Sequence, residues 1–138
     1  MTPQDQQIFD DVAKIAIYHF ADLMYKQQAH EAAARLAAVG LVFDPESTSD
    51  AEKAYEKYEE LMAEYVLGRL PGDYSLTYDY WGARCFSNQR GWEYTKNGFL
   101  AGDVWGRLAW YADFAALKTR VDEFLDELSE NECEMEYA

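Results

Sequence analysis

The sequence predicts an α+β domain in which N-terminal helices and a long C-terminal helix pack on a small two- or three-stranded antiparallel sheet. Apolar residues recur at helical spacing before residue 70 and again from residue 114. The stretch between them is aromatic, β-prone and divided by Gly and Asn turns. With 49% hydrophobic and 16% aromatic residues, 138 positions suffice for one core. A purely helical fold with a long ordered insertion is the alternative.

We expect residues 1–138 to form a single acidic globular domain with four consecutive parts. Residues 1–70 are helical, 71–98 are β-rich, 99–130 return to helix, and 131–138 form an acidic tail. The chain contains no internal repeat.

The N-terminal part begins with a helix start at Thr2-Pro3, a hydroxyl cap followed by a proline that is tolerated in the first turn. Apolar residues at helical spacing form one stripe, and the opposite face holds Asp10, Asp11, Lys14 and Asp22. We expect a break near residues 27–30, more helix to residue 39, and Gly40 as the C-terminal cap.

The next helix is expected to follow a capping box formed by Ser49 and Glu52. It ends before Pro71-Gly72. Its inward stripe comprises Ala51, Ala54, Tyr55, Tyr58, Leu61, Met62 and Tyr65.

The central part contains three candidate strands, at residues 75–80, 84–87 and 92–95. Residues 100–112 return to helical spacing, although Gly102 and Gly106 disfavour a helix there. The last helix begins near Asp113, a cap, and its buried stripe steps by three and four residues. Fraying is expected from Asn131.

The charge is the most unusual property of the chain. The formal net charge is −14, and residues 121–138 contain eight carboxylates and no Lys or Arg. Like-charged pairs four residues apart on a helix each cost about 0.2–0.5 kcal/mol. Acidic side chains near a helix C-terminus also oppose the helix dipole. Burial of apolar side chains offsets this cost, so the protein tolerates the acidic row, but the row does not help it to fold.

Several functional classes are disfavoured by composition. A negative surface repels nucleic acid and anionic lipid, so we expect neither direct nucleic-acid binding nor a membrane partner. The N-terminus lacks the features of a signal peptide and no apolar run could span a bilayer. Cys85 and Cys133 stand far apart, which argues against a disulfide framework and favours the cytoplasm.

Catalytic and metal sites are also not expected. His19 and His30 would lie about 16 Å apart along a helix, too far to share a metal ion. Neither a Ser-His-Asp nor a Cys-His arrangement is visible. We therefore expect no enzyme, metal or cofactor.

The acidic helices point instead to a basic macromolecular partner. A row of carboxylates about 6 Å apart is in the range of the charge spacing along a nucleic-acid duplex. Such a row could occupy the basic groove of a nucleic-acid-binding protein. Trp, Tyr and Arg are enriched at binding hot spots, and four tryptophans lie within thirty residues. The candidate partner-binding residues are Glu52, Glu56, Glu59, Glu60, Asp122, Glu123, Asp126, Glu127, Glu130, Trp92 and Arg90.

In size, charge and acidic helices the chain resembles the antirestriction and anti-CRISPR proteins of phages and plasmids. That resemblance implies a small acidic inhibitor, carried by a phage or mobile element, that binds a host defence nuclease or effector complex as a DNA mimic. It assigns no functional residue.

Three other interpretations remain open. In the first, the acidic faces serve solubility alone. In the second, the protein is an immunity protein or antitoxin that neutralises a basic toxin through its Trp/Tyr/Arg-rich centre. In the third, that centre forms the core, or a small ligand-binding or enzymatic site.

Overall fold

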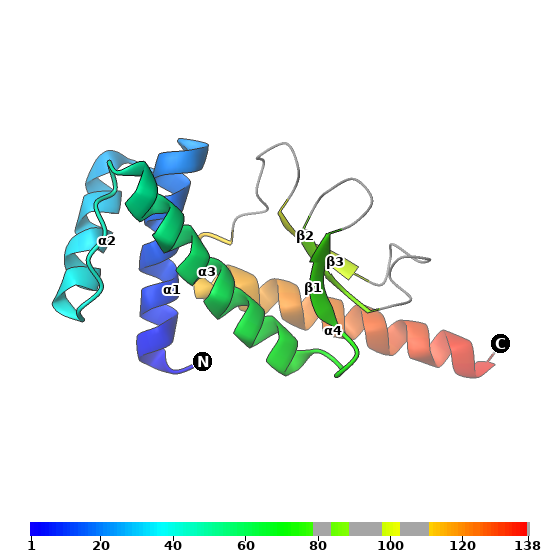
Figure 1. Ribbon diagram of the computed structural model, residues 1–138. Helices are drawn as coiled ribbons and strands as arrows, with labels where there is room; N and C mark the ends of the chain where they lie inside the picture. The colour runs from blue at the N-terminus through cyan, green and yellow to red at the C-terminus, as the bar shows by residue number, and fades with distance from the viewer. Residues whose placement is uncertain (79–83, 89–97, 103–110, 138) are drawn as a thin grey trace.

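The computed structural model describes the chain except for residues 79–83, 89–97, 103–110 and 138; for residues 98–102 and 131–137 it describes the backbone only. Within these limits the protein has helices at both ends and a small sheet between them (Figure 1). This arrangement confirms the predicted α+β class.

The N-terminal helix α1 (Pro3–Ala16) starts as expected, because the Thr2 hydroxyl accepts a hydrogen bond from the Asp5 N–H at 3.1 Å. It continues into a short π-helix, η1 (Ile17–Ala21), which ends at Asp22 with a positive φ of 54°. Helix α2 (Lys26–Ala38) follows. The π-helix and Asp22 therefore redirect the chain before Lys26. The break between the helices lies several residues earlier than the predicted 27–30.

The end of α2 is a Schellman motif. The Leu41 N–H donates to the Leu36 carbonyl at 2.9 Å, and the Gly40 N–H donates to the Ala37 carbonyl at 3.1 Å. Gly40 has a φ of 87°, a left-handed conformation that a residue with a side chain rarely adopts. The predicted cap at Gly40 is confirmed.

Helix α3 (Thr48–Arg69) begins earlier than predicted. The cap is Ser47 rather than Ser49, and its hydroxyl accepts from the Asp50 N–H at 3.4 Å. Asp50 in turn accepts from the Asp44 N–H, which fixes the preceding loop. The predicted inward stripe is largely right, and the residues buried on α3 are Ala51, Ala54, Tyr58, Leu61, Met62 and Val66.

The sheet is three-stranded and antiparallel, in the order β1 (Ser75–Tyr78), β2 (Arg84–Ser87), β3 (Gly98–Gly102). The first two strands match their predicted positions, while the candidate strand at 92–95 lies outside the described residues. β3 occupies the start of the segment predicted as helix, so that prediction is wrong for residues 100–102. Glycine at both ends of β3 disfavours helix, and pairing with β2 decides the structure.

Helix α4 (Phe114–Tyr137) closes the fold. Asp113 caps it, as predicted, by accepting from the Ala116 N–H at 2.8 Å. The backbone stays helical to Tyr137 instead of fraying from Asn131, in keeping with the good helix propensity of Glu and Met.

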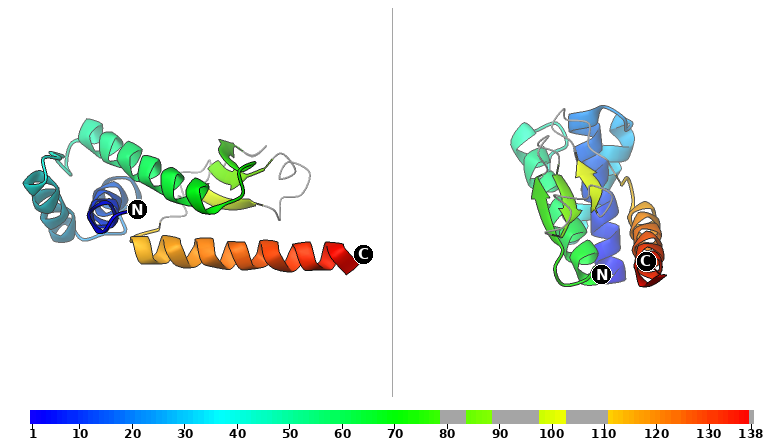
Figure 2. Two further views of the ribbon diagram at one scale, coloured as in Figure 1. Left: turned by 90° about the horizontal axis from the view of Figure 1, so that it is seen from below. Right: turned by 90° about the vertical axis from the view of Figure 1, so that its right-hand side faces the viewer.

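A single hydrophobic core joins the helices to β1 and β2. α1, α3 and α4 contribute the largest fully buried side chains, and Phe86 joins them from β2. Figure 2 shows α3 and the sheet on one side and α4 along the other, with α4 extending past the strands. None of the helices in the described part of the chain is long and apolar enough to cross a membrane.

Candidate functional site

The acidic outer face of α4 is the first candidate surface. Leu117, Val121 and Phe124 are fully buried and set the inward direction of the helix. Of the five predicted carboxylates of this helix, four point away from the core at 100° per residue, namely Asp122, Glu123, Asp126 and Glu130, while Glu127 lies on the flank. All except Asp122, which is half-buried, are exposed.

Two of these five carboxylates are neutralised within the chain. Asp122 accepts from Arg69 Nη2 at 2.8 Å and from Lys118 Nζ at 3.0 Å. These bonds, that from Lys118 first, lower the pKa of Asp122 below its ordinary value. Glu127 lies 3.5 Å from Arg120 Nη1. Asp122 therefore links α4 to Arg69 of α3 and to Lys118 within α4. Glu127 pairs only within α4, with Arg120, among the residues that the structure describes.

The other three carboxylates are Glu123, Asp126 and Glu130. Among the residues that the structure describes, no cation lies within ion-pair distance of any of them. They follow one another at spacings of three and four, so they rise by about 4.5 and 6 Å along the helix axis on one face. We call these three residues the α4 acidic face.

The outer face of α3 is more mixed. Glu52 and Glu56 are exposed without an ion-pair partner in the described part of the chain. Glu60 is 3.8 Å from Lys57, and Glu59 is half-buried at 2.8 Å from Arg84 on β2. Lys53 is also exposed on this helix. The alternation of sign makes the outer face of α3 less negative than that of α4.

The two helices do not combine their acidic residues into one surface. Both turn their buried residues toward the same core, and Figure 2 shows them on different sides of the molecule. Their outer faces therefore point away from one another. A partner with one flat binding surface could contact either face, but not both.

The aromatic part of the predicted site lies outside the described residues. Trp92 and Arg90 fall within residues 89–97, and the other three tryptophans fall within residues 79–83 and 103–110. Their roles stay predictions. Arg84, the described arginine of this region, stacks on Tyr78 with its guanidinium carbon 4.9 Å from the ring centroid.

The burial of Asp11 was not predicted from the sequence. Asp11 was expected on the polar face of α1, but it is 1% exposed. One of its oxygens accepts from Arg35 Nε at 3.1 Å and from Nη2 at 2.8 Å, across the α1–α2 contact. The signal available in the sequence was weak: Asp11 follows Asp10, but Ile8 and Ile15 lie three and four residues away from it, which places Asp11 at the edge of the buried stripe.

Both histidines hold the loop between α2 and α3. His19 contacts the Pro45 carbonyl at 3.1 Å and the Thr48 hydroxyl at 3.2 Å. His30 lies 2.9 Å from Glu46, which also accepts from the Tyr18 hydroxyl at 2.7 Å. The bonds from His30 and Tyr18 lower the pKa of Glu46. In the described part of the chain, no group of three or more His, Cys, Asp or Glu residues is placed to hold a metal ion.

Comparison of the chain with protein-family models, with curated proteins and with solved structures finds no match.

Proposed function

We propose that the protein is a small acidic inhibitor that binds the basic nucleic-acid-binding surface of another protein through the α4 acidic face. In this role the carboxylates take the place of nucleic-acid phosphates, as in the antirestriction and anti-CRISPR proteins that the chain resembles in charge and size. The target would be a nuclease or effector complex of a host defence system.

One observation supports the proposal above the others. Glu123, Asp126 and Glu130 are exposed on one face of a rigid helix, without an ion-pair partner in the described part of the chain. A folding role would favour pairing with the chain's own cations, as Asp122 and Glu127 do. The unpaired carboxylates repel one another and stabilise nothing within the described protein.

The position of α4 also favours this role. The helix projects beyond α3 and the strands (Figures 1 and 2), so a partner could approach its far end without meeting the rest of the described chain. The net charge of −14 would steer a basic partner from a distance, and salt would screen that attraction.

The test compares two variants with the same net charge. The first is Glu123→Gln/Asp126→Asn/Glu130→Gln, which neutralises the α4 acidic face. The second, the matched control, is Glu52→Gln/Glu56→Gln/Glu64→Gln, which removes three exposed carboxylates from α3. Each protein is immobilised, exposed to bacterial lysate at low and high salt, and the captured proteins are then challenged with duplex DNA.

We expect the wild type to capture nucleic-acid-binding proteins at low salt and to compete with duplex DNA for them. The α4 variant should lose this competition, while the α3 variant should keep it. Equal loss of this competition in both variants would mean that the net charge of the protein, and not the α4 acidic face, accounts for the binding. Binding by the α4 variant as strong as that of the wild type at physiological salt would refute the proposal.

A further inference from the structure

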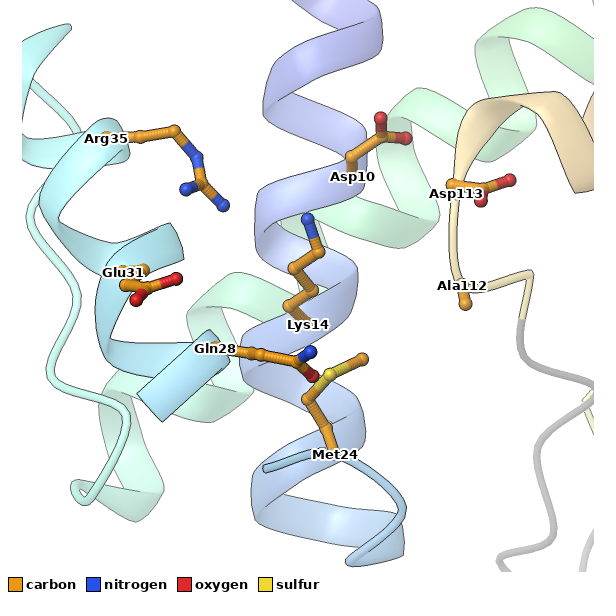
Figure 3. Close-up of a pocket in the computed structure, with 8 residues that line it drawn as sticks. All are labelled: Asp10, Lys14, Met24, Gln28, Glu31, Arg35, Ala112 and Asp113. Carbon is orange, nitrogen blue, oxygen red and sulfur yellow. The ribbon is translucent and has the colours of Figure 1, made fainter. Parts of the chain in front are cut away.

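A cleft lies away from the α4 acidic face. It has a volume of about 460 Å³ and is bordered by α1, by α2 and by the residues that lead into α4. That volume is within the range of about 300–1,000 Å³ typical of small-molecule sites. Figure 3 shows α1 along the middle of the cleft, with α2 on one side and Ala112 and Asp113 on the other.

The cations of the cleft converge on its α1–α2 side. Arg35 points from α2 toward α1, where Lys14 extends into the cleft (Figure 3). Beneath them lies the carboxylate of Asp11, whose side chain is 2% exposed: one oxygen is 2.8 Å from Arg35 Nη2 and 4.0 Å from Lys14 Nζ. One buried carboxylate thus lies within ion-pair distance of both cations, while Glu31, which also lines the cleft from α2, acts on Arg35 from the same helix.

Asp11 is itself held in place. Gln7 Nε2 lies 3.2 Å from each of its oxygens. The ion pair therefore has a fixed anchor inside the α1–α2 contact, although the Arg35 side chain is 45% exposed. A site whose charged groups are positioned by buried partners loses little entropy when a ligand binds.

The negative part of the cleft lies toward α4. Asp10 points from α1 in the direction of Asp113, beyond the ammonium group of Lys14 (Figure 3). Asp10 Oδ1 accepts from the Phe114 N–H at 2.6 Å. Burial raises the pKa of Asp10 against the lowering effect of this bond; the nearby Asp113 raises the pKa further, and the nearby Lys14 lowers it. A cation placed here would stabilise the ionised carboxylate.

We infer that this cleft binds a small zwitterion of the α-amino acid type, with its carboxylate on Lys14 and Arg35 and its ammonium group on Asp10. Met24 and Ala112, which also line the cleft, offer apolar surface to a side chain. This inference goes beyond the proposed inhibitor function and does not depend on it.

Charge decides between a zwitterion and simpler ligands. A free anion would be repelled by a chain of net charge −14 and by the carboxylates of the cleft. A free cation would meet Lys14 and Arg35. A zwitterion adds no net charge and can pair with both sets of groups.

The test is a chemical-shift titration of the isotope-labelled full chain with individual α-amino acids. Acetate, methylammonium, inorganic phosphate and putrescine serve as probes that carry one kind of charge only. At least one amino acid should give saturable shifts at residues 10–14, 28–35 and 112–114, with a dissociation constant of about 1 mM or lower. The single-charge probes should give none at the same concentration.

Two variants test the assigned contacts. Lys14→Met keeps an apolar stem but removes the positive charge, and Asp10→Asn keeps an acceptor for the Phe114 N–H. Each should weaken binding about tenfold, as expected for loss of one charged hydrogen bond. The matched controls, Lys53→Met and Asp126→Asn, remove the same charges from exposed positions on α3 and α4 and should bind like the wild type.

Four results would overturn the inference. Absence of saturable shifts with every amino acid would make the cluster a structural ion-pair network between α1 and α2. Equal binding of acetate or phosphate would make it an anion site, and equal binding of putrescine a cation site. Unchanged affinity in both variants, with their thermal unfolding unaltered, would also contradict it.

Discussion

At the scale of single residues, Tyr58 shows how one hydroxyl joins distant parts of the chain. Its side chain is 1% exposed and stacks on Phe9, with ring centroids 4.8 Å apart. Its oxygen accepts from the Tyr111 N–H at 3.0 Å and lies 3.4 Å from the Tyr111 carbonyl. The hydroxyl thus ties the segment before α4 to the centre of α3.

Tyr58→Phe should lower the free energy of unfolding by about 1–2 kcal/mol, because the ring stacking is kept while the Tyr111 backbone loses its partner. Urea unfolding followed by circular dichroism measures the change. Tyr25→Phe is the control, since Tyr25 is 80% exposed and should show no effect. Equal stability of wild type and Tyr58→Phe would mean that water replaces the hydroxyl without cost.

The buried phenols also predict a loss of stability at alkaline pH. Burial, with a smaller contribution from Glu59, raises the pKa of Tyr55 to about 12. Burial also raises the pKa of Tyr58. An unfolded chain ionises tyrosine near pH 10. The stabilisation is therefore complete below about pH 10 and is lost as the pH rises through the folded-state values.

Urea midpoints measured from about pH 8 to about pH 11 should fall above pH 10. The fall should be smaller in Tyr58→Phe, which has one fewer buried phenol. Parallel curves for the two proteins would exclude Tyr58 as a cause.

At the scale of elements, the start of α3 shows how a cap is selected. Two serines, Ser47 and Ser49, stand near the helix start, but only Ser47 accepts a backbone N–H of the first turn. The residues before it are fastened by Asp50, His19 and Glu46. Contacts from η1, α2 and α3 thus fix the loop, and the loop sets the first residue of the helix.

Ser47→Ala should destabilise the protein by about 0.5–2 kcal/mol, toward the lower end because the capping bond is long. Ser49→Ala should cost less, since the hydroxyl of Ser49 bonds to that of Ser47 and accepts from no backbone N–H in the described part of the chain. Hydrogen exchange at residues 48–51 reports the fraying directly. A larger effect in Ser49→Ala than in Ser47→Ala would place the cap where the sequence alone suggested it.

At the scale of the whole molecule, repulsion among carboxylates should outweigh attraction. The chain has 26 acidic residues and only 12 Lys and Arg. Added salt screens both the repulsion and the surface ion pairs, but exposed ion pairs contribute little. The melting temperature should therefore rise between about 10 and 200 mM NaCl.

Scanning calorimetry of the wild type and of Glu123→Gln/Asp126→Asn/Glu130→Gln tests this prediction. The variant should melt at a higher temperature at low salt and should respond less to added salt, because three repelling charges are gone. A melting temperature that falls with salt would show that the ion pairs, such as that between Arg69 and Asp122, dominate.

Periodicity in the sequence determined most of the elements. The stripes of α1, α3 and α4, the glycine cap at Gly40 and the strands at 75–78 and 84–87 follow from patterns that span a few residues. Such patterns are local, because a helix or strand repeats its side-chain direction every few positions. The segment at 98–102 was different: its pairing with β2 overrode a helical spacing.

Only the tertiary structure decided which charges remain free. Asp11 meets Arg35 24 residues away, and Asp122 meets Arg69 53 residues away. The sequence determined that α3 and α4 carry acidic faces, but not that Glu59 and Asp122 would be paired, nor that the two faces would point apart. Charge pairing depends on distances in the folded chain, which residue order does not encode locally.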